Sequence, residues 1–402
     1  MGSFIFRSAG ESHGKGLTSF VEGIPAGLQL TEDYIHVDMA RRQKGYGRGG
    51  RMQIEKDHAE ILTGVRHGIT LGSPISMWIE NKDWENWKEP MSIGPSNKPP
   101  KLVTRLRPGH ADLPGVFKYN QVDVRNILER SSARETAARV AAGAIAKRFL
   151  EEFGVEIHAH VISIGKIKVP PQKDIDWARV EESEVRVADP TLEKTIIASI
   201  DAAKEAGDTL GGVYETIATG VPVGLGTHVQ WDRKLSTRLA AAFMSVNATK
   251  GVDIGMGFGQ TELPGSKVHD IIEMADPGST YPFKRLSNNA GGLEGGMSNG
   301  EPIVVHAAIK PISTLGKPLP SIDLRTGQKV QAHYERSDVC QVPPACVIGE
   351  AMMAMVIADG ILEKFGGDHM EETKRNYRSY MQTVRLRGEG IRADGDRPAD
   401  DA

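Results

Sequence analysis

Apolar residues recur with the spacing of an α-helix in two long stretches of the chain. In the first, residues 132–135 (Ser-Ala-Arg-Glu) have the form of a capping box, an apolar stripe follows over residues 137–150, and Gly154 is a helix-stop signal. The second stretch runs over about residues 345–365. Weaker helical patterns begin near three further residues, which are Thr31, Thr191 and Asp232.

Four short segments that alternate or run apolar predict β-strands, and glycine or proline bounds them. They are residues 4–8, 157–169, 213–219 and 303–309. Strands and helices do not alternate regularly, which argues against a doubly wound parallel sheet. Residues 82–101 have several prolines near their end and predict a long loop or flap.

No segment has the composition of a linker, so we predict a single α+β domain over residues 1–387. The polar residues 388–402 are expected to form a disordered tail. We expect no membrane-spanning segment and no signal peptide, because no apolar run approaches the length required and the first residues lack a basic region followed by an apolar one.

Composition narrows the class of protein. The 402 residues include 49 basic and 52 acidic side chains, for a formal net charge of −3, and 39% are hydrophobic. These values favour a globular chain over a disordered one and disfavour sequence-independent binding to nucleic acid. The 2 cysteines cannot form a disulfide framework or a four-cysteine zinc site, so we expect a reducing, cytoplasmic location. The 45 glycines concentrate in residues 1–72 and 201–300.

Two familiar motifs match by pattern and fail in context. Residues 45–50 fit GxGxxG, but a helical pattern precedes them and Thr70 occupies the position where a dinucleotide site needs an acid. Residues 10–14, Gly-Glu-Ser-His-Gly, fit the nucleophile elbow of serine hydrolases, which makes a hydrolase using Ser12 the alternative function. That elbow belongs after several strands, whereas only nine residues precede Gly10 here.

His158 and His160 lie two residues apart on a predicted strand, so both side chains point to one face. Such a pair could bind a metal, but two isolated surface histidines are the simpler interpretation. We therefore predict no metal site.

Three clusters of basic residues stand beside glycine, serine or histidine. The first lies within residues 41–51 and has no acid, the second within residues 101–110, and the third surrounds the start of the capped helix at residues 125–139. Free backbone N–H groups at a helix N-terminus, hydroxyl groups and guanidinium groups suit a phosphate or carboxylate. Solvated charged surface is the alternative. Aromatic residues do not interleave with the clusters, so a small polyanion fits better than nucleic acid.

His13 and His110 each occupy a glycine-flanked loop near these cations. Histidine suits proton transfer there because its pKa lies near neutrality and shifts easily. Surface residues are the structural alternative for both. Asp338 precedes the second long helix, where it could instead act as an N-cap.

Taken together, these segments resemble the chorismate synthase family over nearly the whole chain, to about residue 365. Nine blocks in the family's order carry the resemblance: GESHG (10–14), RRQKGYGRGGRM (41–52), RPGHAD (107–112), RSSARETAARVAAGAIAK (130–147), GGVYE (211–215), NATKGVDIGMGFG (247–259), NNAGGLEGGMSNG (288–300), KPIST (310–314) and RSDVC (336–340). A minor departure is Asp208-Thr209, where the family suggests Asp-Ser.

The resemblance implies the last step of the shikimate pathway, a 1,4-anti elimination of phosphate from 5-enolpyruvylshikimate 3-phosphate that gives chorismate. It implies reduced FMN as the cofactor, although the reaction has no net redox change. It also implies a β-α-β sandwich, with helices between two antiparallel sheets, in a homotetramer. The chain has no long insertion of the bifunctional type, so an external source of reduced flavin is expected.

Roles for individual residues also follow from the resemblance. Four arginines are expected to bind the anionic groups of the substrate: Arg42, Arg48, Arg107 and Arg134. His110 is expected to protonate the departing phosphate, and His13 to donate a proton or a hydrogen bond near the flavin N1/O2 edge. Asp338 is expected to help manage the N5 proton, while N5 accepts the C6 proton of the substrate. The residues expected to contact FMN are Arg130, Ser131, Ser132, Asn247, Ala248, Gly295, Lys310, Pro311, Ile312, Ser313, Thr314 and Arg336.

Overall fold

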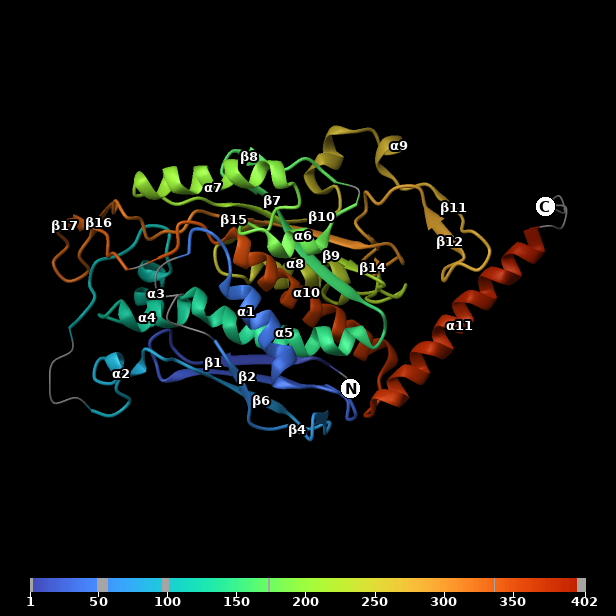
Figure 1. Cartoon of the computed structure of the whole chain (residues 1–402), viewed down its shortest axis with the longest axis horizontal. Helices are drawn as coiled ribbons and strands as arrows, with labels where there is room; N and C mark the ends of the chain where they lie inside the picture. Colours follow the sequence, from blue (N-terminus) through green and yellow to red (C-terminus); the bar gives the residue numbers. More distant parts are fainter. Residues whose placement is uncertain (1–2, 49–56, 96–100, 173, 336, 396–402) are drawn as a thin grey trace.

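The computed structural model describes residues 3–48, 57–95, 101–172, 174–335 and 337–395. Two antiparallel sheets enclose a layer of helices (Figure 1). This arrangement confirms the predicted α+β sandwich, and it places the long central helices between the sheets.

The first sheet has the order β1 (Ile5–Ala9), β2 (Gly16–Glu22), β6 (Ile75–Glu80) and β3 (Ala59–Ile61). The second has the order β10 (Thr249–Ile254), β15 (Ile303–Ile309), β9 (Gly212–Thr219), β7 (Glu156–Ile164) and β8 (Ile167–Lys168). Short hairpins are formed by β4 (Val65–Arg66) with β5 (Ile69–Thr70), β11 (Ile272–Met274) with β12 (Phe283–Arg285), β13 (Leu293–Glu294) with β14 (Met297–Ser298), and β16 (Pro320–Ile322) with β17 (Lys329–Gln331).

The helices lie between and around these sheets. They are α1 (Glu32–Gln43), α2 (Trp84–Trp87), α3 (Asp112–Lys118), α4 (Arg125–Ser131), α5 (Thr136–Glu151), α6 (Trp177–Glu182), α7 (Pro190–Glu205), α8 (Leu235–Met244), α9 (Gly265–Val268), α10 (Val342–Phe365) and α11 (Met370–Gly395). The described residues also form the 3-10 turns η2 (Ala133–Glu135), η3 (Trp231–Arg233) and η4 (Gly257–Glu262).

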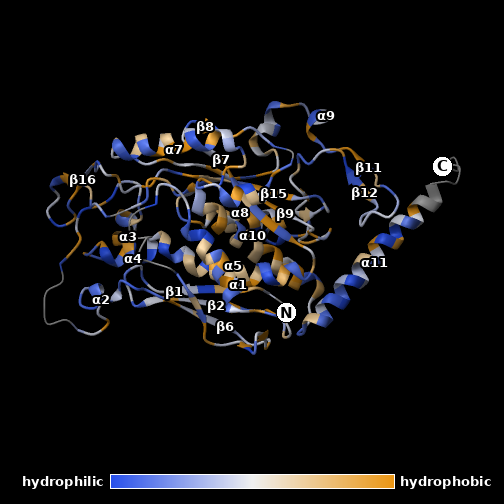
Figure 2. Ribbon diagram, viewed as in Figure 1, coloured by the Kyte–Doolittle hydropathy of each residue, from blue (hydrophilic) through white to orange (hydrophobic). Residues whose placement is uncertain are grey.

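The core is centred on the crossing of α5 and α10. A Cβ added at Gly143 would lie 2.2 Å from the Cβ of Ala351, so the two helices can approach this closely only because residue 143 is glycine. Figure 2 shows hydrophobic residues concentrated on α10 and α8 between the sheets, whereas α11 is mostly hydrophilic. Within the described ranges, α10 alone is long and apolar enough to span a membrane, and 94% of its most apolar window is buried, as in the core of a globular protein.

The predicted helices and strands are largely confirmed, but the predicted capping box is wrong. Ser132 accepts a hydrogen bond from the backbone N–H of Arg134 and caps the 3-10 turn η2, so α5 begins only at Thr136. Glu135 does not return to the cap, because its carboxylate accepts instead from Ser8 on β1 and from Arg139. The predicted strand 157–169 is a hairpin, since a turn separates β7 from β8.

The predicted disordered tail is also wrong over residues 388–395, which continue α11. A Cβ at Gly388 would lie 2.0 Å from that of Pro282, so this part of the helix passes closely over the β11–β12 hairpin. An ion pair one turn apart, Arg385 to Glu389 at 3.0 Å, adds local support. Residues 396–402 lie outside the described part, and the domain boundaries 1–387 stay a prediction. The flap at 82–101 contains α2, and its residues 96–100 are likewise not described.

Candidate active site

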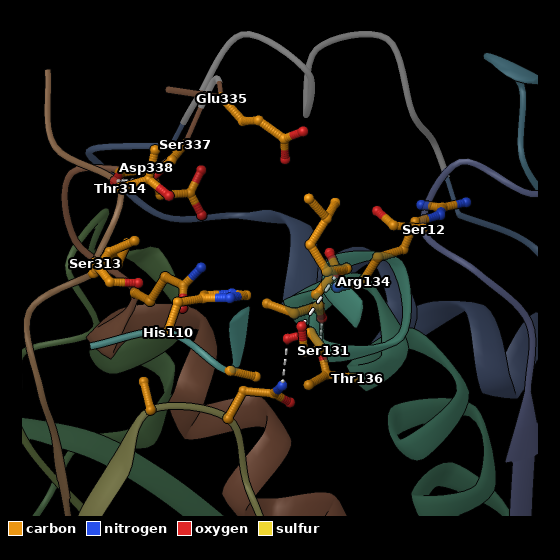
Figure 3. A pocket seen from close by; sticks show the side chains of 18 of the residues that line it. Ser12, His110, Ser131, Arg134, Thr136, Ser313, Thr314, Glu335, Ser337 and Asp338 are labelled. Carbon is orange, nitrogen blue, oxygen red and sulfur yellow. Dashed lines mark hydrogen bonds between the residues drawn. The ribbon is translucent and has the colours of Figure 1, made fainter. Parts of the chain in front are cut away.

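A cavity of about 930 Å³ opens where α1 ends and where α5 and α10 begin. Seven Lys and Arg residues line it against three Asp and Glu residues. The basic residues are Arg42, Arg48, Arg107, Arg125, Arg134, Lys250 and Lys310, and the acidic ones are Asp83, Glu335 and Asp338. Two helix N-termini add the positive ends of their dipoles. Figure 3 shows His110 and Asp338 on one side of the cavity, facing Ser131 and Arg134 on the other.

Arg42 and Arg134 meet at one buried carboxylate. Asp57 pairs with Arg42 through Oδ2 and with Arg134 through Oδ1, the latter at 2.9 Å, and the Asp57 side chain is 1% exposed. Burial alone would raise the pKa of Asp57, but the charges of Arg42 and Arg134 outweigh burial and hold the pKa below its usual value. Asp57 therefore stays ionised and holds the two guanidinium groups side by side at the cavity wall.

Arg107 and His110 share a second buried carboxylate. Asp112 accepts from Arg107 Nε at 2.9 Å and lies 2.5 Å from His110 Nδ1, and its side chain is 0% exposed. The loop over residues 310–314 packs against this one, because Lys310 Nζ donates to the carbonyl oxygen of Gly109. Thr314 Oγ1 lies 3.4 Å from Arg107. The residues that the sequence assigned to substrate and to flavin are therefore in direct contact here.

His13 lies in the turn between β1 and β2, and a third carboxylate holds it. Glu129 of α4 accepts from the His13 backbone N–H at 2.7 Å and lies 2.9 Å from its Nδ1. Glu129 also pairs with Arg125 at 2.8 Å. The ring of Trp87, from the predicted flap, packs against His13 with centroids 4.0 Å apart and the ring planes tilted by 34°, and it lies under the Arg125 guanidinium. The flap therefore contributes a side chain to the cavity.

Arg48 pairs with Asp338, with 3.1 Å between Arg48 NH1 and Asp338 Oδ2. Burial lowers the pKa of Arg48, and Asp338 offsets only part of this effect. Asp338 is thus placed in the cavity by an ion pair, and it is not the N-cap of α10, since α10 begins at Val342 after Gln341.

Most residues that the sequence assigned to FMN line this cavity: Ser131, Ser132, Asn247, Ala248, Lys310, Ile312, Ser313 and Thr314. Arg130 is not in the lining, because its guanidinium donates to the carbonyl oxygens of Ser8 and Gly10. Gly295 lies away from it in the β13–β14 turn, beside His228, and Pro311 is exposed next to lining residues. Arg336 lies outside the described residues.

Buried polar atoms at the wall suit a ligand that carries both acceptors and donors. Nε of Arg42 and of Arg48 are buried without a hydrogen-bond partner among the described residues, and so is Oδ1 of Asn247. Ala248 adopts φ +67°, a left-handed conformation that is costly for a residue with a Cβ. Unpaired donors fit phosphate or carboxylate oxygens, and an unpaired acceptor fits a ring N–H, so these residues are compatible with FMN.

Sequence reasoning missed the acids that hold these side chains, namely Asp57, Glu129 and Glu335. Glu335 lies 3.4 Å from Arg125, and nearby basic groups outweigh its burial and lower its pKa to about 2. No periodic or spacing signal marks such residues, because each meets its partner only in the fold. Asp112 could have been found, since it stands inside the RPGHAD block.

The structure also places the residues of two weaker sequence motifs, Ser12 and the pair His158 and His160. Ser12 lies in a turn between two antiparallel strands, so the strand–turn–helix of a nucleophile elbow is absent at this described position. His160 is 3% exposed and its Nε2 donates to the Glu215 carboxylate at 2.8 Å, so its prediction as a surface residue is wrong. His158 stacks on Trp177. Within the described ranges, no group of three or more potential metal ligands is arranged around a common point.

The model of the chorismate synthase family matches residues 4–362. A chorismate synthase from Geobacter sulfurreducens is 54% identical over 389 residues, which cover 94% of this chain and 99% of the relative. One from Aquifex aeolicus is 53% identical over 392 residues, with 94% and 98% covered. A crystal structure of a chorismate synthase has a TM-score of 0.76 at 44% identity, covering 95% of this chain and 98% of the other. The chain therefore belongs to the chorismate synthase family and is a phosphate-eliminating lyase of the shikimate pathway.

Proposed function

We propose that the chain converts 5-enolpyruvylshikimate 3-phosphate to chorismate in the cavity at the ends of α1, α5 and α10, with reduced FMN bound beside the substrate. The observation that carries this proposal is the excess of cations in the cavity lining, seven Lys and Arg against three Asp and Glu, around three histidines that include His13 and His110. Asp57, Asp112 and Glu129 behind the lining offset part of that excess. A substrate with one phosphate and two carboxylates would compensate the rest, whereas a neutral ester, as a hydrolase would take, would not.

The arginines bind the anionic groups of the substrate. Arg42 and Arg134 stand next to the N-terminus of α5, where free backbone N–H groups and the helix dipole also favour an anion. Arg107 holds the opposite wall next to His110. Each guanidinium is fixed by a buried carboxylate before the ligand arrives, so little side-chain entropy is lost on binding.

His110 gives a proton to the phosphate as its bond to carbon breaks, and Arg107 stabilises the charge that develops. His13 donates a hydrogen bond or proton to the flavin edge, and Asp338 helps to manage the N5 proton. When bound, reduced FMN supplies the electron-rich ring that this redox-neutral elimination requires. The family resemblance supports the further assignment of the FMN-contacting residues, including the three that do not line the cavity of a single chain.

The same resemblance supports a homotetramer in the cytoplasm and an external source of reduced flavin. Sedimentation velocity of the purified chain tests the first of these expectations, with a species of about four times 43.6 kDa as the expected result. A stable monomer with full turnover would refute it. Turnover with NADPH and oxidised FMN alone, under anaerobic conditions, would refute the external supply.

One assay tests the reaction. The chain is incubated anaerobically with dithionite-reduced FMN and the enolpyruvyl substrate, and phosphate and chorismate are measured together. We expect equal amounts of both products, and no phosphate when FMN is left oxidised. Release of phosphate without chorismate would favour a hydrolase, and flavin binding without either product would favour a binding protein.

Substitutions of the two histidines and of Arg107 test the roles proposed for these residues. His110→Ala and His13→Ala should fold, bind flavin and lose at least tenfold in turnover, within the range of about 10²–10⁴ typical of general acid–base groups. Arg107→Ala should raise the substrate KM more than it raises the Kd for FMN, because the guanidinium binds the substrate. Wild-type turnover in both histidine variants would refute the catalytic roles.

A further inference from the structure

One buried carboxylate receives four hydrogen-bond donors at the wall of the cavity. Oδ2 of Asp112 accepts from the backbone N–H of Arg107 at 3.0 Å and from its Nε at 2.9 Å. Oδ1 accepts from Arg107 NH2 at 3.0 Å and lies 2.5 Å from His110 Nδ1. The Asp112 side chain is 0% exposed, so these donors replace water completely.

We propose that Asp112 is a positioning residue: it fixes His110 as the Nδ1–H form, so that Nε2 is the nitrogen that exchanges protons in the cavity, and it holds Arg107 beside it. This inference deepens the proposed function and rests on it. Asp112 itself does not line the cavity, whereas both of its partners do.

The Asp112 carboxylate is ionised in the folded protein. Burial would raise the pKa of Asp112, but hydrogen bonds from His110 and Arg107 outweigh burial and hold the pKa far below its usual value. An ionised carboxylate can only accept hydrogen bonds. The short contact with His110 Nδ1 therefore requires a proton on Nδ1, in the neutral ring as well as in the imidazolium.

One contact would favour the opposite tautomer. Arg107 NH2 lies 3.0 Å from His110 Nδ1, and it could donate there only if Nδ1 carried no proton. That tautomer would place an unprotonated nitrogen 2.5 Å from the ionised carboxylate of Asp112, so the shorter contact decides for Nδ1–H. Arg107 NH2 has an acceptor at the same distance in Asp112 Oδ1, and both donors thus converge on one oxygen. Figure 3 shows the His110 ring pointing into the cavity toward Ser131 and Arg134.

The arrangement also explains why an amide cannot replace Asp112. An asparagine offers one oxygen and one NH2 group, so two of the four donors would face another donor. Asp112→Asn should therefore release the His110 tautomer and loosen Arg107 at the same time. A tautomer error of this kind can cost a catalytic histidine up to about 10⁴ in kcat.

The direct test is ¹⁵N NMR of the full chain with labelled histidine, where the His110 signals are assigned by their loss in His110→Ala. We expect the neutral ring to be present as the Nδ1–H tautomer, with the proton on Nδ1 and none on Nε2. A neutral ring present as the Nε2–H tautomer in the wild-type chain would overturn the inference. This measurement is made on the wild-type chain and does not depend on turnover, so it stands even if the proposed reaction fails.

Kinetics provide the second test. Asp112→Asn should lower kcat at least tenfold and raise the substrate KM, whereas the Kd for FMN should stay within about threefold. Asp112→Glu, which restores the charge, should recover part of kcat and the Nδ1–H signal. The control is Asp174→Asn, an identical change at an exposed position, which should leave kcat and the Nδ1–H signal of His110 unchanged. A wild-type tautomer and kcat in Asp112→Asn would overturn the positioning role.

Discussion

Replacing Asp57 by asparagine should destabilise the empty protein more than it destabilises the anion-bound one. The Asp57 side chain is 1% exposed, and it pairs with two arginines whose own side chains are each 5% exposed. Removing one partner of a buried ion pair typically costs about 3–5 kcal/mol, because the remaining charge has neither water nor a counter-ion. Two guanidinium groups lose the same buried counter-charge here, so we expect a loss at the upper end of that range.

An anion should restore part of this loss. Without Asp57, Arg42 and Arg134 repel each other, and inorganic phosphate bound between them supplies the missing charge. A ligand at about 100 times its Kd stabilises a protein by roughly 2.7 kcal/mol, so the effect is measurable by urea unfolding with and without phosphate. We expect phosphate to raise the free energy of unfolding of Asp57→Asn more than that of the wild type. The difference in stability between the two proteins should therefore be smaller with phosphate than without it.

The pH dependence follows from the same carboxylate. Because the folded pKa of Asp57 lies below the unfolded value, its contribution to stability is present above the unfolded pKa and is lost as the pH falls through the folded pKa. The stability difference between wild type and Asp57→Asn should therefore be full near pH 7 and shrink below about pH 4. Asp174→Asn, at an exposed position, should stay within about 0.5 kcal/mol of wild type throughout. An Asp57→Asn chain as stable as that control at pH 7 would refute the reasoning.

Three further outcomes can be checked. Glu129→Gln should lower turnover about tenfold or more, because the amide removes the negative charge beside His13 and turns an NH2 group toward donors of His13 or Arg125, while phosphate binding measured by calorimetry changes little. Ser12→Ala should retain most of the turnover, whereas a serine hydrolase would lose about 10⁶ in kcat. Burial raises the pKa of Cys340 to about 11 and that of Cys346 to about 12, so both thiols should react with a disulfide reagent at pH 8 only after denaturation, and rapid labelling of the folded chain would contradict this.

Much of the fold could be predicted from periodicity. The strand β15 has its predicted bounds, and α10 begins only three residues before its predicted start, because alternating and helical patterns directly reflect which face is buried. The tail was misjudged for the opposite reason. Its polar composition gives no packing signal, yet α11 is anchored upstream by Tyr377, which packs on Phe153 and Phe365. Propagation from an anchored turn is easier than nucleation of a new helix.

The site could be predicted only in part. Residues such as His13, His110 and Arg134 stand in recognisable blocks, so the resemblance found them. Their carboxylate partners come from far along the chain in two of the three cases: Asp57 lies 77 residues from Arg134, and Glu129 lies 116 residues from His13. Local sequence carries no information about such pairs, and the near-neutral net charge concealed the local excess of cations.

The basic cluster at residues 41–51 shows why a run of like charges in the sequence is not one site. Neighbouring residues on an α-helix point about 100° apart, so Arg41 and Arg42 leave α1 on different sides. Arg42 enters the cavity, whereas Arg41 turns to Glu350 of α10, with 2.6 Å between Arg41 NH1 and Glu350 Oε2. Lys147 of α5 reaches the same carboxylate at 2.5 Å.

Glu350 thus joins the three central helices at one buried point. Burial would raise its pKa, but Lys147 and Arg41 outweigh burial and keep it ionised. The ends of these helices carry or adjoin Arg42, Arg134 and Asp338, which line the cavity. Arg41, which the sequence grouped with the ligand-binding arginines, therefore does not line the cavity. It pairs with Glu350 instead and helps to fix the helices that bring the ligand-binding charges together.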